Sequence, residues 1–594
     1  MVAVRYVAVV DTPSIKQFVF ATDVLQEIRG ASALLDRLNR VELPEMIQKA
    51  AADLGGSASV VFSAGGAGQF IIEGLNEDQV VTVLNKAARL FAEKSEWELR
   101  LVAGYAPWED GSLYQTAVRR AFGMLQRVRD WAAPRHSVLT APILRECDSL
   151  SHVPASFHEE EEEWVSRATR LKREEATRVR TLRAAAGGVG PFVSWYQWLG
   201  RKLGRDVAVQ APDDFRGIGN ALESGGHIAV VYCDGNNMGR LVQELQSPEV
   251  AKAFSEIVDS SVREACLKAL YEVVYLPHVQ GRAKSEQGGA SERGSGAESE
   301  GTVSSDEVAE ITTVPFDILL LGGDDVVVAI PARAALPFAL KVLEYFETES
   351  RKRITEATGE VRSFFEGKLK DKPLSLCAGV AVARASYPFY LILELAEDLL
   401  KSAKAGATQE RIGSGEKYAT PSYLDFQWIE GGASFRLEDL RTIDYQVCEC
   451  GVQVGDRMVW EARRTCRPYS LTRARELLKQ AATLARIPSS KRHALWEAAL
   501  EPRVLEAELK LQQLLGRLSS RTGGGVSEQV AWWNALGCLV PPGWEFDYPW
   551  YRRSEEKDGK SGVRLMTAAA DLLEVVEYLP PNAGKKSGEQ PDRS

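Results

Sequence analysis

Residues 316–330 read FDILLLGGDDVVVAI, two apolar runs separated by two glycines and two adjacent aspartates. This pattern predicts a β-hairpin with acids at its tip, since glycine supplies the positive φ and small size that a two-residue turn needs. We expect Gly322 and Gly323 to form the turn and to let a phosphate chain approach the backbone. Asp324 and Asp325 would present hard oxygen ligands that suit Mg²⁺ or Mn²⁺ holding a nucleotide triphosphate. A simple polar turn is the alternative, but repulsion between the two carboxylates disfavours it unless a cation is present.

A second hairpin of the same outline is predicted at residues 57–72, SASVVFSAGGAGQFII, without the acids. The elements around both hairpins also repeat. In each copy a strand ends in an aspartate and runs into a helix, at residues 6–20 in the first copy and 228–242 in the second. After each hairpin a helix leads to a further strand, at residues 97–107 in the first copy and 373–383 in the second. The order β-α-β-β-α-β therefore occurs twice, as in a ferredoxin-like palm.

The two copies differ in their acids. In the second copy Asp234 closes the first strand, while Asp324 and Asp325 begin the third. These strands are neighbours in an antiparallel palm, so we expect three carboxylates to converge and to hold two divalent cations. The first copy keeps only Asp11, which is a poor divalent site alone. We interpret the first palm as a structural partner that can complete a nucleotide pocket.

The predicted fold class is α+β, with two ferredoxin-like palm domains of the nucleotide cyclase or polymerase type and with helical inter-palm and C-terminal domains. At 594 residues several domains are expected. The predicted domains are a first palm at 1–107, a mainly helical inter-palm domain at 108–226, a second palm at 227–435, a helical C-terminal domain at 436–580 and a disordered tail at 581–594. A Gly, Ser and Glu-rich segment, 281–307, is expected to be a disordered insertion in the second palm. Helical patterns at 471–487 and 491–518 indicate that the C-terminal domain is all-α.

Composition limits the function. With 45% hydrophobic and 26% charged residues, and without a run of about 18 apolar residues, the chain reads as a soluble globular protein that does not enter a membrane. We expect it in the cytoplasm, because its N-terminus lacks the cationic region of a signal peptide. The net charge of −10 argues against coating nucleic acid with the whole surface. Arginines crowd residues 159–183 and could face a phosphate backbone, although offsetting glutamates also suit a solvated helix.

Taken together, the paired palms and several short motifs resemble the large polymerase-like subunit of type III CRISPR effector complexes. The motifs are the opening stretch IKQFVFATDVLQEIRGASALLDRLN (15–39), the turn CDGNNMGRL (233–241), the LGGDD signature, the segment CAGVAVARASYPFYLILELAEDLLKSAK (377–404) and RPYSLTRARELL (467–478). The resemblance covers most of the chain. It implies a metal-dependent nucleotidyltransferase that converts ATP into cyclic oligoadenylate when the complex meets target RNA. It also implies guide RNA and the other subunits of such a complex as partners.

The resemblance and the residues together suggest a set of site residues. Asp234, Asp324 and Asp325 are the expected catalytic residues and ligands of two Mg²⁺ or Mn²⁺ ions, with ATP as substrate. The expected nucleotide-binding residues are Gly235, Asn236, Asn237, Met238, Gly239, Gly322, Gly323, Lys404, Arg29 and Ser32. Backbone amides of the 235–239 turn would cradle phosphates, and Lys404, at the end of the last palm helix, would reach a β or γ phosphate. Arg29 and Ser32 would contribute from the first palm, with packing inside a helix as the alternative.

The chain departs from the family pattern in three places. Asn236 stands where the family usually has a second aspartate, which removes one possible ligand. None of the six histidines is followed by aspartate, so we expect no HD nuclease activity. The zinc module between the palms is reduced to Cys147 and His152, too few ligands for a tetrahedral site, so we expect no structural zinc there. Cys448, Cys450 and Cys466 form a looser cluster whose metal binding the sequence leaves open.

Two other functions remain open at this stage. The chain could be a non-catalytic scaffold that binds guide RNA and partner subunits, or a stand-alone nucleotide cyclase of an antiviral signalling system. The related GGDEF cyclases use GTP in a similar palm, so the acids alone do not decide which base is used.

Overall fold

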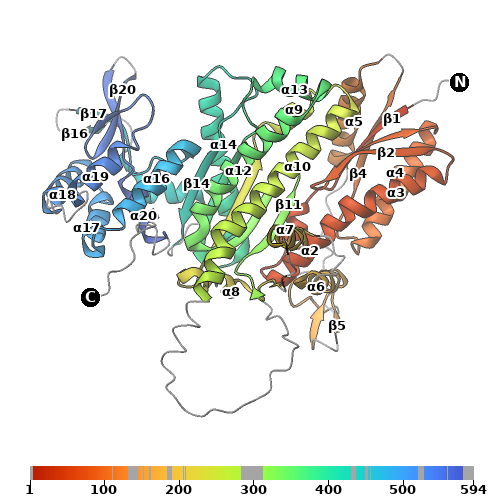
Figure 1. The fold of residues 1–594 in the computed structure, drawn as a ribbon, viewed down its shortest axis with the longest axis horizontal. Helices are drawn as coiled ribbons and strands as arrows, with labels where there is room; N and C mark the ends of the chain where they lie inside the picture. Colours follow the sequence, from red (N-terminus) through yellow and green to blue (C-terminus); the bar gives the residue numbers. More distant parts are fainter. Residues whose placement is uncertain are drawn as a thin grey trace, which may run out of the picture.

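The structure is a computed structural model, and it describes residues 5–109, 112–131, 145–150, 153–158, 162–182, 190–204, 207, 209–282, 312–429, 436–448, 452–454, 457–518, 527–557 and 560–579. The second palm lies at the centre of the molecule, between the first palm and the C-terminal region (Figure 1). The predicted insertion, apart from its first two residues, and the C-terminal tail lie outside the described residues. No helix in the described parts is long and apolar enough to cross a membrane.

The first palm is a four-stranded antiparallel sheet with helices packed against it. Its elements are β1 (Arg5–Asp11), α1 (Ile15–Val19), α2 (Leu25–Arg37), a π-helical turn (Leu38–Glu42), α3 (Leu43–Ala52), β2 (Ser57–Ala64), β3 (Ala67–Glu73), α4 (Glu77–Lys94) and β4 (Val102–Trp108). The strand order β2-β3-β1-β4 is that of a ferredoxin-like palm, as predicted. Helix α4 begins at a capping box in which Asn76 and Gln79 satisfy each other's backbone amides.

The second palm repeats this topology and extends it. Its elements are β9 (His227–Gly235), α9 (Met238–Val242), α10 (Pro248–Leu270), β11 (Asp317–Gly322), β12 (Asp325–Pro331), α12 (Ala335–Glu356), α13 (Gly359–Leu369), β13 (Leu376–Arg384), α14 (Phe389–Gly413) and β14 (Tyr423–Trp428). The strand order is β11-β12-β9-β13-β14-β18, where β18 (Tyr469–Ser470) comes from the C-terminal region. The core of β9 is buried on both faces, which explains its continuous apolar run. The predicted α+β fold with two palms is confirmed.

The inter-palm region is mainly helical. It holds α5 (Tyr114–Trp131), α6 (Arg167–Arg180), α7 (Pro191–Leu203) and α8 (Phe215–Gly219), with short strands β5 (Ser156–His158), β6 (Glu163–Val165), β7 (Thr181–Leu182) and β8 (Val209–Gln210); β10 (Thr312–Thr313) pairs with β8. Helices α5 and α6 pack on the first palm, and α7 and α8 contact strands of the second palm. The arginines of α6 are largely neutralised. For example, Arg173 pairs with Glu27 and Glu163, and Arg178 pairs with Glu175. This pairing favours the interpretation of α6 as a helix with offsetting glutamates.

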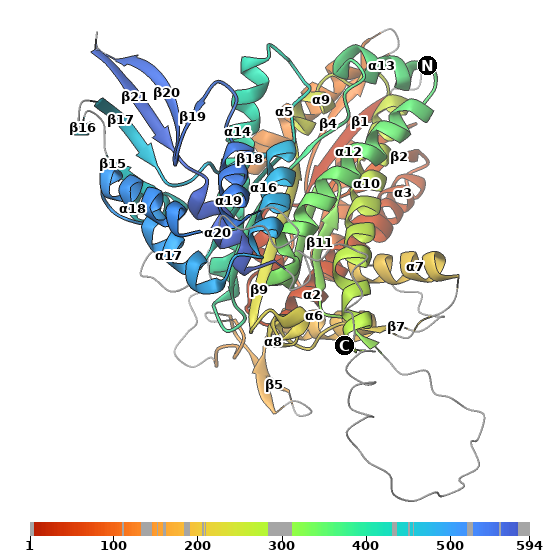
Figure 2. The ribbon, with the colours of Figure 1, turned by 60° about the vertical axis from the view of Figure 1, so that its left-hand side comes forward.

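The C-terminal region is not all-α, so that prediction is wrong. It contains helices α15 (Leu437–Leu440), α16 (Leu471–Leu484), α17 (Ser489–Ala499), α18 (Val504–Arg517), α19 (Glu528–Gly537) and α20 (Ala569–Glu577). It also contains a sheet in the order β15-β17-β21-β20-β19, from strands Gln446–Cys448, Arg457–Arg463, Lys560–Met566, Trp550–Lys557 and Glu545–Asp547, with β16 (Val452–Val454) paired to β17. These strands gather at one side of the molecule (Figure 2). Strands such as WYRRSEEK carry charges on both faces and so lack the apolar alternation that would reveal them.

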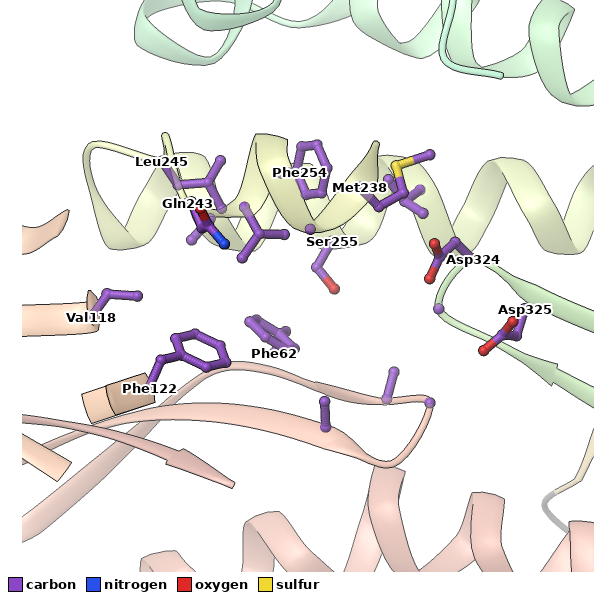
Figure 3. A pocket seen from close by; sticks show the side chains of 18 of the residues that line it. Phe62, Val118, Phe122, Met238, Gln243, Leu245, Phe254, Ser255, Asp324 and Asp325 are labelled. Carbon is purple, nitrogen blue, oxygen red and sulfur yellow. The ribbon is translucent and has the colours of Figure 1, made fainter. Parts of the chain in front are cut away.

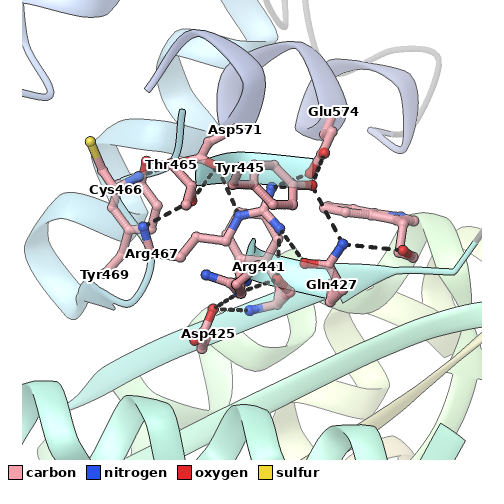
Figure 4. A network of polar contacts seen from close by, with 12 residues as sticks. Asp425, Gln427, Arg441, Tyr445, Thr465, Cys466, Arg467, Tyr469, Asp571 and Glu574 are labelled. Carbon is pink, nitrogen blue, oxygen red and sulfur yellow. Dashed lines mark hydrogen bonds and ion pairs between the residues drawn. The ribbon is translucent and has the colours of Figure 1, made fainter. Parts of the chain in front are cut away.

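A buried polar network joins the C-terminal region to the second palm (Figure 4). The guanidinium of Arg467 is fully buried and donates to Asp571 Oδ1 at 2.8 Å, to Glu574 and to the Phe426 carbonyl of β14 at 2.9 Å. Asp571 also accepts from the Tyr469 hydroxyl and the Cys466 amide. The Arg-Pro-Tyr motif singled out in the sequence therefore holds the two regions together.

Candidate functional site

The tips of the two hairpins meet. A Cβ placed on Gly65 would lie 3.3 Å from the Gly322 carbonyl oxygen, and one placed on Gly322 would lie 3.4 Å from the Gly65 Cα. Such an approach of two backbones leaves little room for side chains, which favours glycine at both positions. The first palm therefore faces the second with equivalent hairpins in contact.

The turn of the acidic hairpin lies one residue later than predicted. Gly322 pairs with Asp325, so the two turn residues are Gly323 and Asp324 rather than the two glycines. Gly323 has φ of 62°, the left-handed region that favours glycine. As a result, Asp324 sits in the turn itself, whereas Asp325 begins β12.

The three predicted aspartates come together. Strands β9 and β12 are antiparallel with Cys233 opposite Val326, which brings Asp234 and Asp325 to the same end of the strand pair. Asp324 reaches the same place from the turn, because its Oδ2 would lie 2.5 Å from a Cβ on Gly235. Residues about 90 positions apart therefore form one carboxylate cluster.

The lysines near the carboxylate cluster do not offset its burial and the repulsion among its aspartates. Burial, followed by the charge of Asp234, raises the pKa of Asp324 to about 7. Burial and the charges of Asp234 and Asp324 also raise the pKa of Asp325 well above its usual range. Lys404 offsets part of this charge, since its ammonium pairs with Asp234 and donates to the Gly235 carbonyl at 3.2 Å. Lys404 lies inside α14 rather than at its end.

Hard carboxylate oxygens that are partly buried and short of countercharge form a donor set suited to a divalent cation. The aspartates are neighbours without being a preformed chelate, because no three His, Cys, Asp or Glu side chains in the described residues are arranged to hold a metal ion. The Lys404 ammonium contacts one member of this donor set, Asp234.

A cavity of about 640 Å³ opens between the palms at the acidic hairpin. Figure 3 shows Asp324 and Asp325 at one end of this cavity and Phe62 and Phe122 toward the other. Its volume falls within the range of small-molecule sites. The lining is mostly apolar, with Arg119 as the cationic side chain among the described lining residues. The palms and α5 together therefore enclose a space with aromatic walls and an acidic end.

The turn after Asp234 has a part held by hydrogen bonds and a part that lines the cavity. The side-chain amide of Asn236 donates to Ser375 Oγ at 3.0 Å, and its backbone amide donates to the Ser375 carbonyl at 3.0 Å. Asn237, at φ of 58°, donates its side-chain amide to the Tyr418 carbonyl at 3.0 Å. Met238 and Gly239 line the cavity, as do Gly322 and Gly323. The asparagines thus shape the turn, and the residues after them meet the cavity.

Arg29 and Ser32 do not reach the cavity. The Arg29 guanidinium is buried and pairs with Asp317 Oδ2 at 2.7 Å, at the end of β11 opposite to the acidic tip. Ser32 is buried in α2. Between them, Gly30 lets α2 approach α6, because a Cβ there would lie 1.7 Å from the Lys172 carbonyl oxygen. The Gly-x-Ser segment therefore serves packing, which is the alternative considered for it.

Lys16 is a neighbour of the cluster that the sequence analysis missed. Its ammonium lies 4.7 Å from the centre of the Tyr232 ring and pairs with Glu397 at 3.0 Å, and its charge acts to lower the pKa of Asp325. The repeat could have revealed it, because α1 follows β1 as α9 follows β9. No pattern in the sequence marked the aromatic side chains that line the cavity.

The structure covers only some of the cysteines for which the sequence raised the question of metal binding. Cys147 is buried and its sulfur accepts from the Ser166 amide at 3.3 Å, while His152 lies outside the described residues. Cys466 is buried in the Arg467 network. Cys450 and the side chain of Cys448 lie outside the described residues, so metal binding by that cluster stays open.

The fold and the site define a class: a tandem-palm protein of the nucleotide cyclase and polymerase type, with the three-aspartate cluster in the second palm. Residues 227–413, which run from β9 to the end of α14, match the family model of the Cas10/Cmr2 second palm domain. The chain thus carries a Cas10/Cmr2 second palm, and the resemblance to the large subunit of type III CRISPR complexes is confirmed over this domain.

Comparisons with solved structures give matches at low identity. A Csm1–Csm4 cassette in complex with AMPPNP is 13% identical with a TM-score of 0.47, covering 90% of this chain and 69% of that one. A Csm1–Csm4 cassette in complex with cA4 is 14% identical with a TM-score of 0.38, covering 68% and 53%. Csm1 in T. onnurineus is 15% identical with a TM-score of 0.45, covering 86% and 64%. The chain thus spans between 53% and 69% of the length of these three. No curated protein matches the chain.

Proposed function

We propose that the chain is the nucleotidyltransferase subunit of a type III CRISPR effector complex and joins ATP into cyclic oligoadenylate when target RNA is bound. The observation that carries this proposal is the convergence of Asp234, Asp324 and Asp325, short of positive charge, beside a cavity in a Cas10/Cmr2 second palm. Guide RNA, target RNA and the other subunits of the complex are the proposed partners, in the cytoplasm.

The proposed chemistry is attack of a ribose hydroxyl on the α-phosphorus of a second ATP, which releases pyrophosphate. Asp234, Asp324 and Asp325 would hold Mg²⁺ or Mn²⁺, which would neutralise the triphosphate and lower the pKa of the attacking hydroxyl. The chain's own residues would hold the two nucleotides in position and keep water away from them. The walls around Phe62 and Phe122 would shield a base, and the turn at Met238 and Gly239, which lines the cavity, would lie along the phosphates.

Lys404 has a distinct part in this proposal. Its ammonium pairs with Asp234, and it can turn toward a phosphate once a stronger cation occupies the carboxylates. Asp324, with a pKa of about 7, is partly protonated at neutral pH, which limits repulsion in the cluster until a cation binds.

The test is synthesis by the purified chain, alone and with copurified RNA and subunits, given each NTP with Mg²⁺ and with products resolved by mass. Wild type should form oligoadenylate rings from ATP, and D324A/D325A should form none while keeping its fold. The control D53A removes an exposed aspartate of the first palm and should retain synthesis. Product from D324A/D325A would refute the assignment of the acids. A wild-type complex that never forms product would favour a scaffold, and a lone chain active without RNA would favour a stand-alone cyclase.

A further inference from the structure

The tip of the acidic hairpin is held from outside the hairpin by one turn of α10. Asp259 Oδ1 accepts a hydrogen bond from the Gly323 backbone amide at 3.2 Å. Four residues along the same helix, the guanidinium of Arg263 donates to the Leu321 carbonyl at 3.1 Å and pairs with Asp259 Oδ2 at 3.1 Å. Backbone groups on both sides of Gly322 are therefore fixed by two side chains that also bind each other.

The first palm reaches into this contact through Arg40. Arg40 donates to Asp259 Oδ1 at 2.6 Å and to Oδ2 at 3.3 Å, a two-pronged contact between a guanidinium and a carboxylate. Its Nε donates at 2.6 Å to Asp36, which lies 3.7 Å from Arg263. Two arginines and two aspartates, from both palms, thus form one closed network behind the acidic tip.

The network is partly shielded from water, and its arginines act on Asp259. Burial would raise the pKa of Asp259, but the charges of Arg263 and Arg40 outweigh it and hold the pKa below its usual range. The side chains of the four residues are between 10% and 23% exposed, so solvent weakens their attraction much less than at an open surface. The Gly323 amide is therefore held by a full carboxylate charge, which makes the stronger kind of hydrogen bond.

We propose that Asp259 and Arg40 are positioning residues for the acidic tip: Asp259 fixes the Gly323 amide and hence the turn that carries Asp324, and Arg40 makes that placement depend on the contact between the palms. The inference rests on the proposed function, because a rigid tip would serve to hold the aspartates in place for nucleotidyl transfer. The placement itself is measurable without catalysis. A change in the position of the first palm would then reach the carboxylates through Asp259.

The test is hydrogen exchange measured by mass spectrometry on peptides covering residues 319–327, in the full chain without nucleotide. D259N removes the charge and keeps the shape, and we expect roughly tenfold faster exchange in this peptide, as for loss of a charge-assisted hydrogen bond. R40Q should give a smaller increase in the same peptide. The double variant R40Q/D259N should exchange no faster than D259N, because Arg40 acts through Asp259. Unchanged exchange at the hairpin in D259N, or equal acceleration in every peptide, would overturn the proposal.

The matched control is R475Q, which breaks another inter-element arginine–carboxylate pair, Arg475 to Glu344 at 2.8 Å. It should leave exchange of the hairpin peptide at the wild-type rate. If D259N fails to fold, R40K keeps the charge with fewer donors and should exchange between wild type and R40Q; equal rates in the three would contradict the proposal.

Synthesis then separates this proposal from the proposed function. In an active complex D259N should lower kcat about tenfold with little change in KM, because the acids are displaced while the cavity walls are kept. Absence of product from wild type would count against the proposed function alone, since the exchange result decides the positioning role by itself.

Discussion

At the scale of single residues, Gly235 shows how tightly the carboxylates are packed. It follows Asp234 at the end of β9, and its backbone carbonyl accepts from Lys404. A Cβ at this position would meet Asp324 Oδ2 and the Met238 side chain, both at 2.5 Å. The turn between β9 and α9 can therefore carry no side chain here without moving an acid.

We predict that G235A lowers product formation at least about tenfold, because the added methyl displaces Asp324 from Asp234, at a stability cost of roughly 1–3 kcal/mol typical of overpacking. G367A is the matched control, since a Cβ on Gly367 in α13 would meet nothing within 4 Å. Initial rates of synthesis and thermal unfolding of both variants check this. Equal rates for the two variants would show that the space between Gly235 and Asp324 is not critical.

At the scale of elements, the contact of α2 with α6 places a charged group in the interior. Lys172 of α6 is buried, and its ammonium donates to the Phe18 carbonyl at 2.7 Å and lies 4.2 Å from the centre of the Phe18 ring. Burial lowers the pKa of Lys172 to about 8, against 10.5 for an ordinary lysine. Between these values the unfolded chain binds more protons than the folded chain, so stability attributable to Lys172 rises with pH over that window.

We predict that wild type gains roughly 2 kcal/mol of unfolding free energy relative to K172M as the pH rises from about 7.5 to about 9.5. The measurement is urea unfolding of both proteins at the two pH values, with K86M as a control at an exposed lysine. A difference between wild type and K172M that stays constant with pH would mean that Lys172 titrates normally.

The helices and strands differ in how far the sequence could predict them. The hairpins and the repeated topology follow from apolar runs broken by glycine pairs, which is local information. The charged strands β20 and β21 had no such pattern, and the turn shifted by one residue because Asp324 can occupy a turn position. Arg29 was wrongly expected at the site, because a resemblance to a family indicates residue types but not where each side chain points. The bond between Arg40 and Asp259 spans 219 positions, and no local signal marks it.

At the scale of the whole molecule, Arg467 joins the C-terminal region to the second palm through buried ion pairs and hydrogen bonds. Its guanidinium is fully buried between Asp571 and Glu574, which would be left as uncompensated charges without it. Breaking a buried pair in this way is far more costly than losing an exposed one.

We predict that R467M loses about 3–5 kcal/mol of unfolding free energy and exposes the C-terminal region to limited proteolysis. R475Q, which breaks a more exposed pair between α12 and α16, should lose less than about 1 kcal/mol. Equal protease resistance of R467M and R475Q would contradict a central role for the buried network.

The central claim is that three aspartates of the second palm share divalent cations beside a nucleotide. The most direct measurement is Mn²⁺ uptake by the full chain in the presence of a non-hydrolysable ATP analogue, followed by the electron paramagnetic resonance signal of free Mn²⁺. Wild type and the control D53N, changed at an exposed aspartate, should take up Mn²⁺ equally, and D234N/D324N/D325N should take up none beyond what the nucleotide binds in solution. Uptake by the triple variant equal to that of wild type would contradict the account.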